Sequence, residues 1–340
     1  MINFDKKIWI PYNELSSTLN NLKRKQINDL YYTDIKLDNY DEFGKLSFCF
    51  VPLEQIYIYE KRCEKLYEAI QVRDTETVIC DEIYYTTKIE GAHTTRKRTH
   101  EIHNGDKLDN NNYTSEKMVQ NGFRATKYLN IIGNKVNKDN IRKIWEILVE
   151  DVCDNADIKG FHYRNGDVEI GNVYGLAPDQ LEDAMNNWFS YYNSATDNEL
   201  PFIKAALLHY SFERIHPFCD GNGRMGRLLS SNFLIGLGYD KIKAVSFSMS
   251  IGKHSDGYYN TMNLAGNNYF DCTPFLVYML EREVNALGYA YLQNKLGEYL
   301  SLVNDETLNN LKSIDECNNI YNDLLPYINK DNDEIDREDE

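Results

Sequence analysis

One stretch of the chain gathers residues that could bind a polyphosphate and catalyse attack on it. Residues 216–227 read HPFCDGNGRMGR and lie between two helical patterns. The glycines form a turn that opens a helix, and the first turn of a helix carries backbone N–H groups that attract anions. Arg224 and Arg227 stand three residues apart on this helix, so both guanidinium groups can reach one anion. The pattern predicts a site for a di- or triphosphate.

Two further side chains of this stretch suit phosphate chemistry. Asp220 would be an odd choice for binding a bare anion, but it fits as the ligand of a Mg²⁺ ion that the phosphates also coordinate. His216 ends the preceding helix, because Pro217 disfavours helical geometry in the residue before it. A histidine placed there can act as a general base near neutral pH. The plainer interpretations are that His216 is structural and that the two arginines form a solvated helix face.

The same residues also match a dinucleotide-binding pattern. Residues 221–226 fit G-x-G-x-x-G, and Asp240 lies 19 residues beyond Gly221. That pattern requires an apolar strand directly before the glycines, whereas the preceding SFERIHPF contains charges and a proline. The other common phosphate-binding pattern, G-x-x-x-x-G-K-[ST], does not occur in the chain. A Rossmann fold is therefore disfavoured.

The elements that must position these residues are mostly helices. Apolar residues recur at spacings of three and four, which predicts amphipathic helices at 56–79, 118–132, 141–152, 181–192, 202–212 and 275–289. Residues 161–178 break this pattern, because Asn165-Gly166 is a turn signal between short β-favouring flanks. The sequence predicts a mainly α fold with one small β-hairpin.

Composition excludes several classes of protein. The chain has 340 residues and a formal net charge of −16, which makes it a poor general binder of DNA. It has no apolar run long enough to span a membrane, and its start carries charge where a signal peptide needs an apolar stretch. Its seven cysteines are scattered, which argues against disulfides and structural zinc and for a reducing environment. We therefore expect a cytoplasmic protein.

The stretch at 216–227 resembles the signature of the Fic domain family, H-P-F-x-[D/E]-G-N-G-R-x-x-R, with every specified position filled. The resemblance extends over about 86–280 and implies a Fic-type helical bundle with a small β-hairpin flap. It implies transfer of AMP from ATP to a Tyr, Thr or Ser hydroxyl of a target protein, and glycines at 221 and 223 favour AMP over phosphate transfer. His216 would then take the proton from the attacking hydroxyl, and Phe218 would anchor the loop. The ATP and Mg²⁺ site implied by the resemblance comprises Asp220 (the Mg²⁺ ligand), Gly221, Asn222, Gly223, Arg224, Met225, Gly226 and Arg227.

Two other segments also resemble parts of that family. The hairpin resembles the flap that holds the target as an added strand, and its ATP-covering, target-pairing strip would be Val168, Glu169, Ile170 and Gly171. Residues 258–265 resemble the helix that closes the adenine pocket, with Tyr258 nearest the base. The alternatives are a structural hairpin and a plain packing helix.

A third segment resembles the family's inhibitory motif, [S/T]-x-x-x-E-[G/N]. Thr86, Glu90 and Gly91 fill its three specified positions, at the end of a helix predicted at about 78–91. By that resemblance, Glu90 pairs with Arg227 in a bidentate contact and keeps the arginine from the γ-phosphate. Glu90 could instead orient a water for AMP removal. An AMP-removing hydrolase and a non-catalytic ATP-binding regulator are therefore the alternative functions.

We divide the chain by these patterns. Residues 1–112 are predicted as an N-terminal helical region that carries the inhibitory helix, and residues 113–290 as the Fic core. Residues 291–330 are predicted as a C-terminal helical extension, and 331–340 as an acidic, disordered tail. Expected partners are a target protein docked on the flap, the protein itself through auto-modification, and a second copy in a homodimer. DNA and membranes are not expected.

Overall fold

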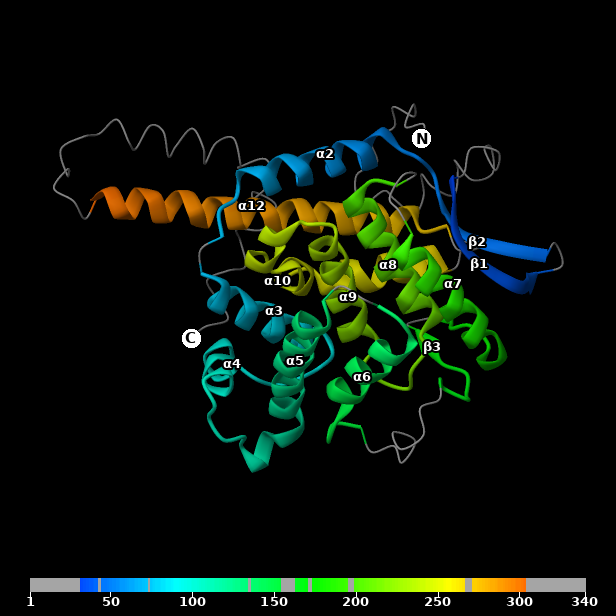
Figure 1. Cartoon of the computed structure of the whole chain (residues 1–340), viewed down its shortest axis with the longest axis horizontal. Coiled ribbons are helices and arrows are strands. Elements are labelled where there is room, and N and C mark those ends of the chain that lie inside the picture. Colours follow the sequence, from blue (N-terminus) through cyan, green and yellow to red (C-terminus); the bar gives the residue numbers. More distant parts are fainter. Residues whose placement is uncertain are drawn as a thin grey trace.

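Helices account for most of the described chain, as the spacing of its apolar residues predicts. The computed structural model describes residues 31–41, 44–72, 74–133, 136–153, 163–170, 173–194, 199–266 and 271–303. These ranges form a bundle of α-helices with two small antiparallel sheets of two strands each (Figure 1). The predicted acidic tail 331–340, most of the predicted extension 291–330, and Gly171 lie outside the described residues.

Helix α8 (Pro201–Ile215) lies in the interior of the bundle, and all of its residues after the proline are buried. The helix predicted at 202–212 is therefore confirmed. Its N-terminus is held by helix α2 (Glu54–Ala69), where the Glu60 carboxylate accepts hydrogen bonds from the backbone N–H groups of Phe202, at 3.2 Å, and Ile203, at 2.8 Å. These N–H groups have no partner within their own helix, so the carboxylate replaces the missing acceptors.

The other helices of the predicted core surround α8. The predictions at 118–132, 141–152 and 181–192 are confirmed as helices, although the second ends three residues early, where Asp151 has a φ of 58°. These helices and the one that follows α8 are α5 (Tyr113–Ile132), α6 (Lys138–Val149), α7 (Leu181–Asn193) and α9 (Asn222–Gly236).

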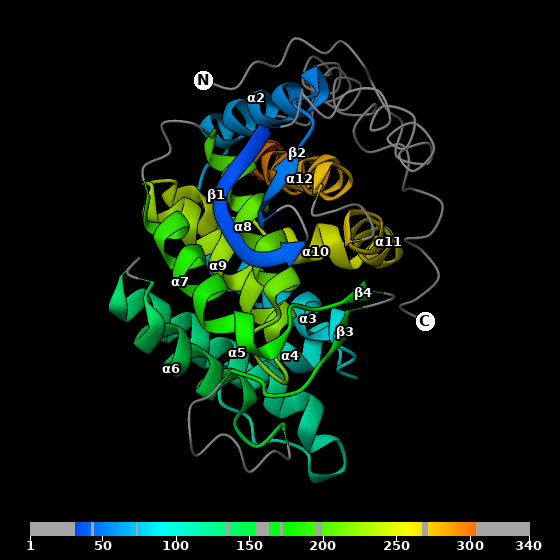
Figure 2. The same cartoon turned by 90° about the vertical axis from the view of Figure 1, so that its right-hand side faces the viewer.

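The N-terminal region differs from the prediction in two respects. The single helix predicted at 56–79 is wrong, because α2 ends and a separate helix α3 (Thr75–Ile89) begins after Asp74, whose side chain accepts a hydrogen bond from the N–H of Thr77 at 2.9 Å. The prediction that the N-terminal region is helical also omits two strands. These are β1 (Tyr31–Asp41) and β2 (Gly44–Phe50), which form an antiparallel pair. Figure 2 shows this sheet apart from the shorter one formed by β3 and β4.

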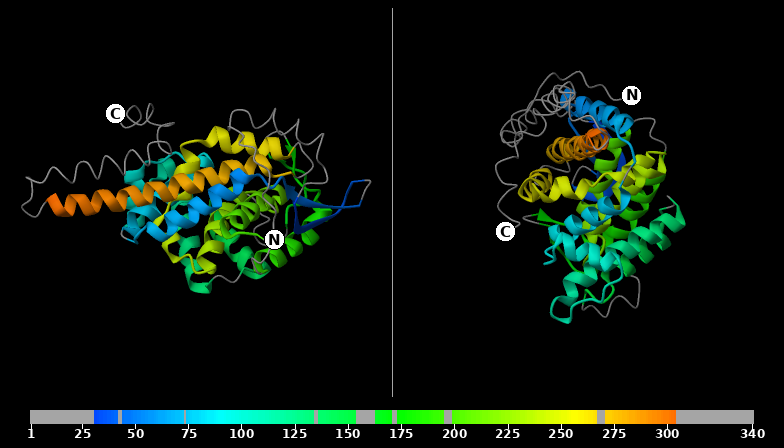
Figure 3. Two further views of the ribbon diagram at one scale, coloured as in Figure 1. Left: turned by 90° about the horizontal axis from the view of Figure 1, so that it is seen from above. Right: turned by 90° about the vertical axis from the view of Figure 1, so that its left-hand side faces the viewer.

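The C-terminal part of the described chain is also helical. Helix α12 lies alongside α2 (Figures 1 and 3) and continues through residue 290, so the predicted boundary between the core and its extension falls inside a helix. No helix in the described ranges is both long and apolar enough to cross a membrane. The remaining α-helices are α4 (Arg96–His103), α10 (Phe247–Gly252), α11 (Ser255–Gly266) and α12 (Thr273–Val303), and short 3-10 helices cover Asn110–Asn112, Pro178–Gln180 and Asp240–Ala244.

The contact between Glu60 and helix α8 predicts a measurable stabilisation. The Glu60→Ala variant leaves two buried backbone N–H groups without an acceptor, so we expect its free energy of unfolding to fall by about 1–3 kcal/mol in urea denaturation. Glu64→Ala is the matched control on the same helix, because Glu64 contacts only the half-exposed Lys61 among the described residues, in a contact worth at most about 1 kcal/mol. Equal losses in the two variants would contradict the capping role of Glu60.

Candidate active site at the junction of helices α8 and α9

His216 stands at the C-terminal end of helix α8 in a backbone conformation that is uncommon for its residue type. Its φ is 49° and its ψ is 59°, and its N–H donates to the carbonyl of Phe212 at 2.9 Å. The ring nitrogen Nδ1 lies 3.3 Å from the carbonyl oxygen of Glu213, which can only accept, so Nδ1 carries the proton in this contact. The other ring nitrogen, Nε2, then has a lone pair. Burial lowers the pKa of His216 to about 4, although its hydrogen bond to Glu213 opposes this shift.

The loop between the two helices is fixed by Phe218. Its ring is fully buried and stacks on Trp145 of α6, with ring centroids 5.0 Å apart. The Asn222 side chain accepts a hydrogen bond from the N–H of Phe218 at 3.0 Å and donates to its carbonyl at 2.8 Å. The Asn222 side chain therefore holds the loop through its oxygen and one of its two N–H donors.

Helix α9 follows this loop directly, and its first backbone N–H groups have no partner within the helix. Gly221 precedes the helix with a φ of 82°, a conformation in which a side chain is strained. The second glycine, Gly223, lies against the Glu90 carboxylate, and a Cβ atom at this position would overlap Glu90 Oε1. The Glu90 carboxylate therefore lies at the N-terminal turn of α9, where the sequence predicts the anion site.

The two arginines of α9 have different surroundings. Arg224 is 2% exposed, and its NH1 and NH2 atoms donate to the Leu148 carbonyl at 3.0 Å and to Asp220 Oδ1 at 3.2 Å. That both arginines reach one anion stays a prediction; in this structure Arg224 is directed at α6 and at the loop. Their spacing of three residues places them on neighbouring faces of the helix, but it does not decide which one is turned inward.

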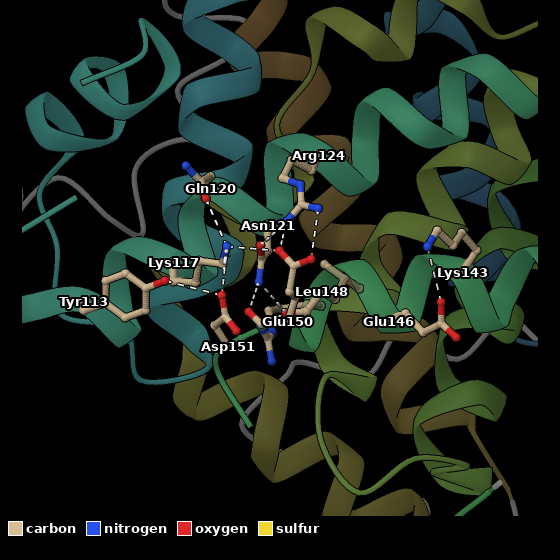
Figure 4. A network of polar contacts seen from close by, with 11 residues as sticks. Tyr113, Lys117, Gln120, Asn121, Arg124, Lys143, Glu146, Leu148, Glu150 and Asp151 are labelled. Atoms are coloured by element: carbon tan, nitrogen blue, oxygen red, sulfur yellow. Dashed lines mark hydrogen bonds and ion pairs between the residues drawn. The ribbon is translucent and has the colours of Figure 1, made fainter. Parts of the chain in front are cut away.

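Figure 4 shows the polar contacts that hold the end of α6 against α5. Asn121 Nδ2 donates to the Glu150 carbonyl at 2.7 Å, and Lys117 Nζ lies 3.0 Å from the Glu150 carboxylate. Arg124 pairs with the same carboxylate. The carbonyl of Leu148, which accepts from Arg224, belongs to this segment. The network therefore holds in place the segment that binds Arg224 in the N-terminal turn of α9.

Arg227 is held by the end of helix α3. Its Nε donates to Thr86 Oγ1 at 2.8 Å, and its NH2 donates to the Thr86 carbonyl at 3.1 Å and to Glu90 Oε1 at 2.7 Å. The structure thus brings Glu90 and Arg227 together through one oxygen and one nitrogen, and the predicted bidentate contact is wrong. NH1 of Arg227 is buried without a hydrogen-bond partner among the described residues. Gly91 follows with a φ of 83°, as a glycine at a helix end is expected to.

Tyr258 is buried in a polar cluster beneath Arg227. Its hydroxyl lies 3.1 Å from His209 Nε2, and the residue is only 3% exposed. Its place nearest an adenine base stays a prediction, and the neighbouring Tyr259 is the more exposed of the two residues. Glu213 belongs to the same cluster, and burial raises its pKa to about 8, while burial lowers the pKa of His209 to about 3. This cluster was not predicted from the sequence, although Glu213 and His209 precede His216 at helical spacing.

The predicted flap is present as a short hairpin. Strands β3 (Glu169–Ile170) and β4 (Val173–Tyr174) pair with Glu169 opposite Tyr174. The predicted turn at Asn165-Gly166 is wrong, because the strands flank residues 171–172 and the bend at 165–166 precedes both. Val168 adjoins the first strand and its carbonyl accepts from the N–H of Gly175 at 2.9 Å.

Asp220 is the candidate metal ligand. Its side chain is 37% exposed, and Oδ1 accepts hydrogen bonds from the Gly221 N–H and from Arg224. No group of three or more His, Cys, Asp or Glu side chains in the described ranges could hold a metal ion. Mg²⁺ is often bound by one or two carboxylates together with substrate phosphates and water. A single, partly exposed carboxylate beside an anion site fits that manner of binding.

Comparison with known proteins agrees with this architecture. Residues 135–234, from the start of α6 to most of α9, match the family model for the Fic/DOC family. A Fido domain-containing protein of Dictyostelium discoideum is 35% identical over 109 residues, which are 32% of this chain and 72% of that protein. "Protein adenylyltransferase Fic" of Aedes aegypti is 28% identical over 232 residues, which are 66% of this chain and 44% of that protein. The chain thus spans less than half the length of the mosquito relative.

A solved structure shares the fold. A Fic family protein from Desulfovibrio desulfuricans G20 superposes with a TM-score of 0.63 at 21% identity, over 71% of this chain and 75% of that chain. The expected mainly α fold with a small hairpin is therefore confirmed. The family model matches residues 135–234, and this chain covers 72% of the relative from Dictyostelium at 35% identity. The chain therefore belongs to the Fic/DOC family.

Proposed function

We propose that this protein is a protein adenylyltransferase that transfers AMP from ATP to a Tyr, Thr or Ser hydroxyl of a target protein, and that Glu90 inhibits it. The observation that carries the proposal is the position of the Glu90 carboxylate, which contacts Arg227 and lies over Gly223 at the N-terminus of α9. The name of the relative from Aedes aegypti, a protein adenylyltransferase, supports the activity.

The geometry of His216 suits a general base. Its Nδ1 proton is held by the Glu213 carbonyl, so Nε2 can accept the proton of the attacking hydroxyl. As that oxygen bonds to the α-phosphorus, the bond from the α-phosphorus to the bridging oxygen breaks and pyrophosphate leaves. Mg²⁺, held by Asp220 and the phosphates, would neutralise charge on the leaving group when bound. The N–H groups at the start of α9 supply further positive potential from the protein itself.

Inhibition follows from competition between two anions for one cation. Arg227 is 3% exposed, and a buried guanidinium needs an anion beside it. Glu90 supplies one, from a side chain that is 26% exposed and so borders the surface. In our proposal, the γ-phosphate of ATP competes for the same arginine, and its unpartnered NH1 atom is a donor that a phosphate oxygen can use. With Glu90 in place, the triphosphate cannot adopt the reactive position.

The partners that we propose follow from the hairpin and the family. A target segment would add to the edge of β3–β4 as an extra strand and bring its hydroxyl toward His216. The same arrangement permits auto-modification, and a homodimer is the assembly that we propose. The cytoplasm is the proposed compartment, because the seven cysteines are scattered along the chain as in proteins of a reducing environment.

The proposal predicts that removing Glu90 activates the protein. With α-labelled ATP and Mg²⁺, we expect Glu90→Gly to incorporate AMP into itself or a target roughly 10- to 1,000-fold faster than the unmodified chain, because Arg227 becomes available to phosphate. The double variant Glu90→Gly/His216→Ala should lose at least about 100-fold of this rate.

A matched control separates the brake from helix destabilisation. Glu76→Gly introduces the same change into the exposed first turn of α3, away from Arg227, and should leave incorporation unchanged. Activation by both variants would contradict a specific role of Glu90. Absence of label in every variant, with ATP still bound, would replace the proposal with a non-catalytic regulator. Removal of AMP from a modified protein only when Glu90 is present would favour the hydrolase.

The surroundings of His216 predict its state in solution. Because burial lowers its pKa to about 4, the neutral form persists in the folded protein from pH 8 down to about pH 5, and the ring gains a proton only as the pH falls further. In ¹⁵N-labelled protein, the ring nitrogens should show one neutral tautomer with the proton on Nδ1 across this interval. The His216→Ala variant assigns the signals. Protonation of His216 near pH 6.5 would contradict the effect of burial on its pKa, and a neutral tautomer with the proton on Nε2 would contradict the base role.

A further inference from the structure

Arg164 connects the base of the hairpin to the end of helix α8. Its backbone N–H donates to the Pro217 carbonyl at 2.9 Å. Its side chain donates from Nε to the His216 carbonyl at 2.7 Å and from NH2 to the Ile215 carbonyl at 3.3 Å. One residue therefore binds three consecutive carbonyl groups, and the middle one belongs to the proposed base.

The other donors of Arg164 bind the hairpin segment from which it comes. NH1 donates to the Gly166 carbonyl at 2.7 Å, and NH2 donates to the Leu176 carbonyl. The residue is 7% exposed, and every hydrogen-bond acceptor around its guanidinium group is a carbonyl oxygen. The last carbonyls of a helix carry partial negative charge, so a cation at the end of α8 is favourably placed.

These contacts bear on the backbone conformation of His216. A non-glycine residue with a φ of 49° lies in a sparsely populated region and persists only when its surroundings hold it there. Rotation of either peptide beside His216 would withdraw a carbonyl from Arg164. The guanidinium group makes no hydrogen bond to the imidazole ring. Its charge contributes to lowering the pKa of His216, and its hydrogen bonds act on the ring through the backbone.

We propose that Arg164 is a positioning residue, which fixes the backbone of His216 so that Nδ1 keeps its bond to the Glu213 carbonyl and Nε2 faces the reacting hydroxyl. This inference rests on the proposed function for its kinetic consequence, but not for its structural one. Arg164 also binds the hairpin segment. The same residue therefore holds both the hairpin that is proposed to bind the target and the backbone of the proposed base.

The chain offers two ways to disturb this support. Arg164→Lys keeps the charge but provides a single ammonium group in place of a planar fork that reaches several carbonyls. Gly175→Ala keeps the arginine but crowds it, because a Cβ at Gly175 would lie 3.0 Å from Arg164 NH2 and 2.9 Å from Val168 Cγ2. Arg98→Lys is the control, since Arg98 of α4 is also bound by several acceptors, including Glu116 and the Lys107 carbonyl, in a network remote in sequence from the site.

The kinetic test uses the full chain with Glu90→Gly as the parent. We expect Arg164→Lys and Gly175→Ala each to lower kcat for AMP transfer by roughly 10- to 100-fold, as misplacement of a base does. The KM for ATP should stay within about twofold in Arg164→Lys, because Arg227 and the start of α9 are untouched. Arg98→Lys should change neither constant. A proportional rise in KM with unchanged kcat would overturn the inference.

A second readout separates this inference from the proposed function. The ¹⁵N spectrum of the histidine rings, recorded at pH 6.5 without ATP, should lose the single Nδ1–H tautomer of His216 in Arg164→Lys and in Gly175→Ala, but not in Arg98→Lys. An unchanged His216 signal in both variants would overturn the positioning role even where kcat falls. If the parent transfers no AMP at all, the proposed function fails, and the spectrum alone still decides the role of Arg164.

Discussion

Phe218 lies between the two helices that supply the site, and its burial fixes how they meet. Its ring stacks on Trp145, while the Asn222 side chain binds both its N–H and its carbonyl. The chain must therefore reverse within a few residues, from the C-terminal end of α8 to the N-terminal end of α9. The two helix ends have opposite partial charges, so a proton acceptor and an anion site come to lie side by side. The left-handed conformation of Gly221 completes the turn, and the neutral state of His216 follows from its burial there.

Arg227 sets the electrostatic requirement of the site, because it is buried and must be satisfied by some anion. Removing one partner of such a pair leaves an uncompensated buried charge, which is strongly unfavourable unless another anion replaces it. The protein satisfies the arginine with Thr86 and Glu90 of α3. Of these two partners, Glu90 alone is charged. Its side chain is partly exposed, whereas Thr86 is buried. In our proposal, inhibition and ligand binding are thus two states of one charge balance.

The helices and the signature loop could be predicted from the sequence because both are encoded locally. Apolar spacing marks a helix whatever it packs against, and Pro217 with Gly221 marks the turn. The roles of the two arginines could not be read in this way, since Arg224 is turned toward the Leu148 carbonyl by the packing of α6 against α9. The burial of Tyr258 could not be predicted for the same reason, because it depends on packing beside His209 and Phe275. The β1–β2 hairpin was not predicted, although residues 34–38 and 45–48 alternate between polar and apolar side chains.

The anchoring of α3 decides how the Glu90 contact can be broken. Glu82 of α3 accepts hydrogen bonds from the N–H of Ser248 at 2.9 Å and from the hydroxyl of Ser246 at 2.9 Å, at the start of α10, and Asp81 pairs with Arg96 of α4. Lifting α3 from the bundle would break these contacts together and leave the buried Glu82 carboxylate without its donors, which costs far more than one ion pair. Glu90, by contrast, caps the helix with its own backbone and holds Arg227 with a single oxygen. Rotation of the Glu90 side chain therefore releases the arginine at the smallest cost, while α3 stays in place.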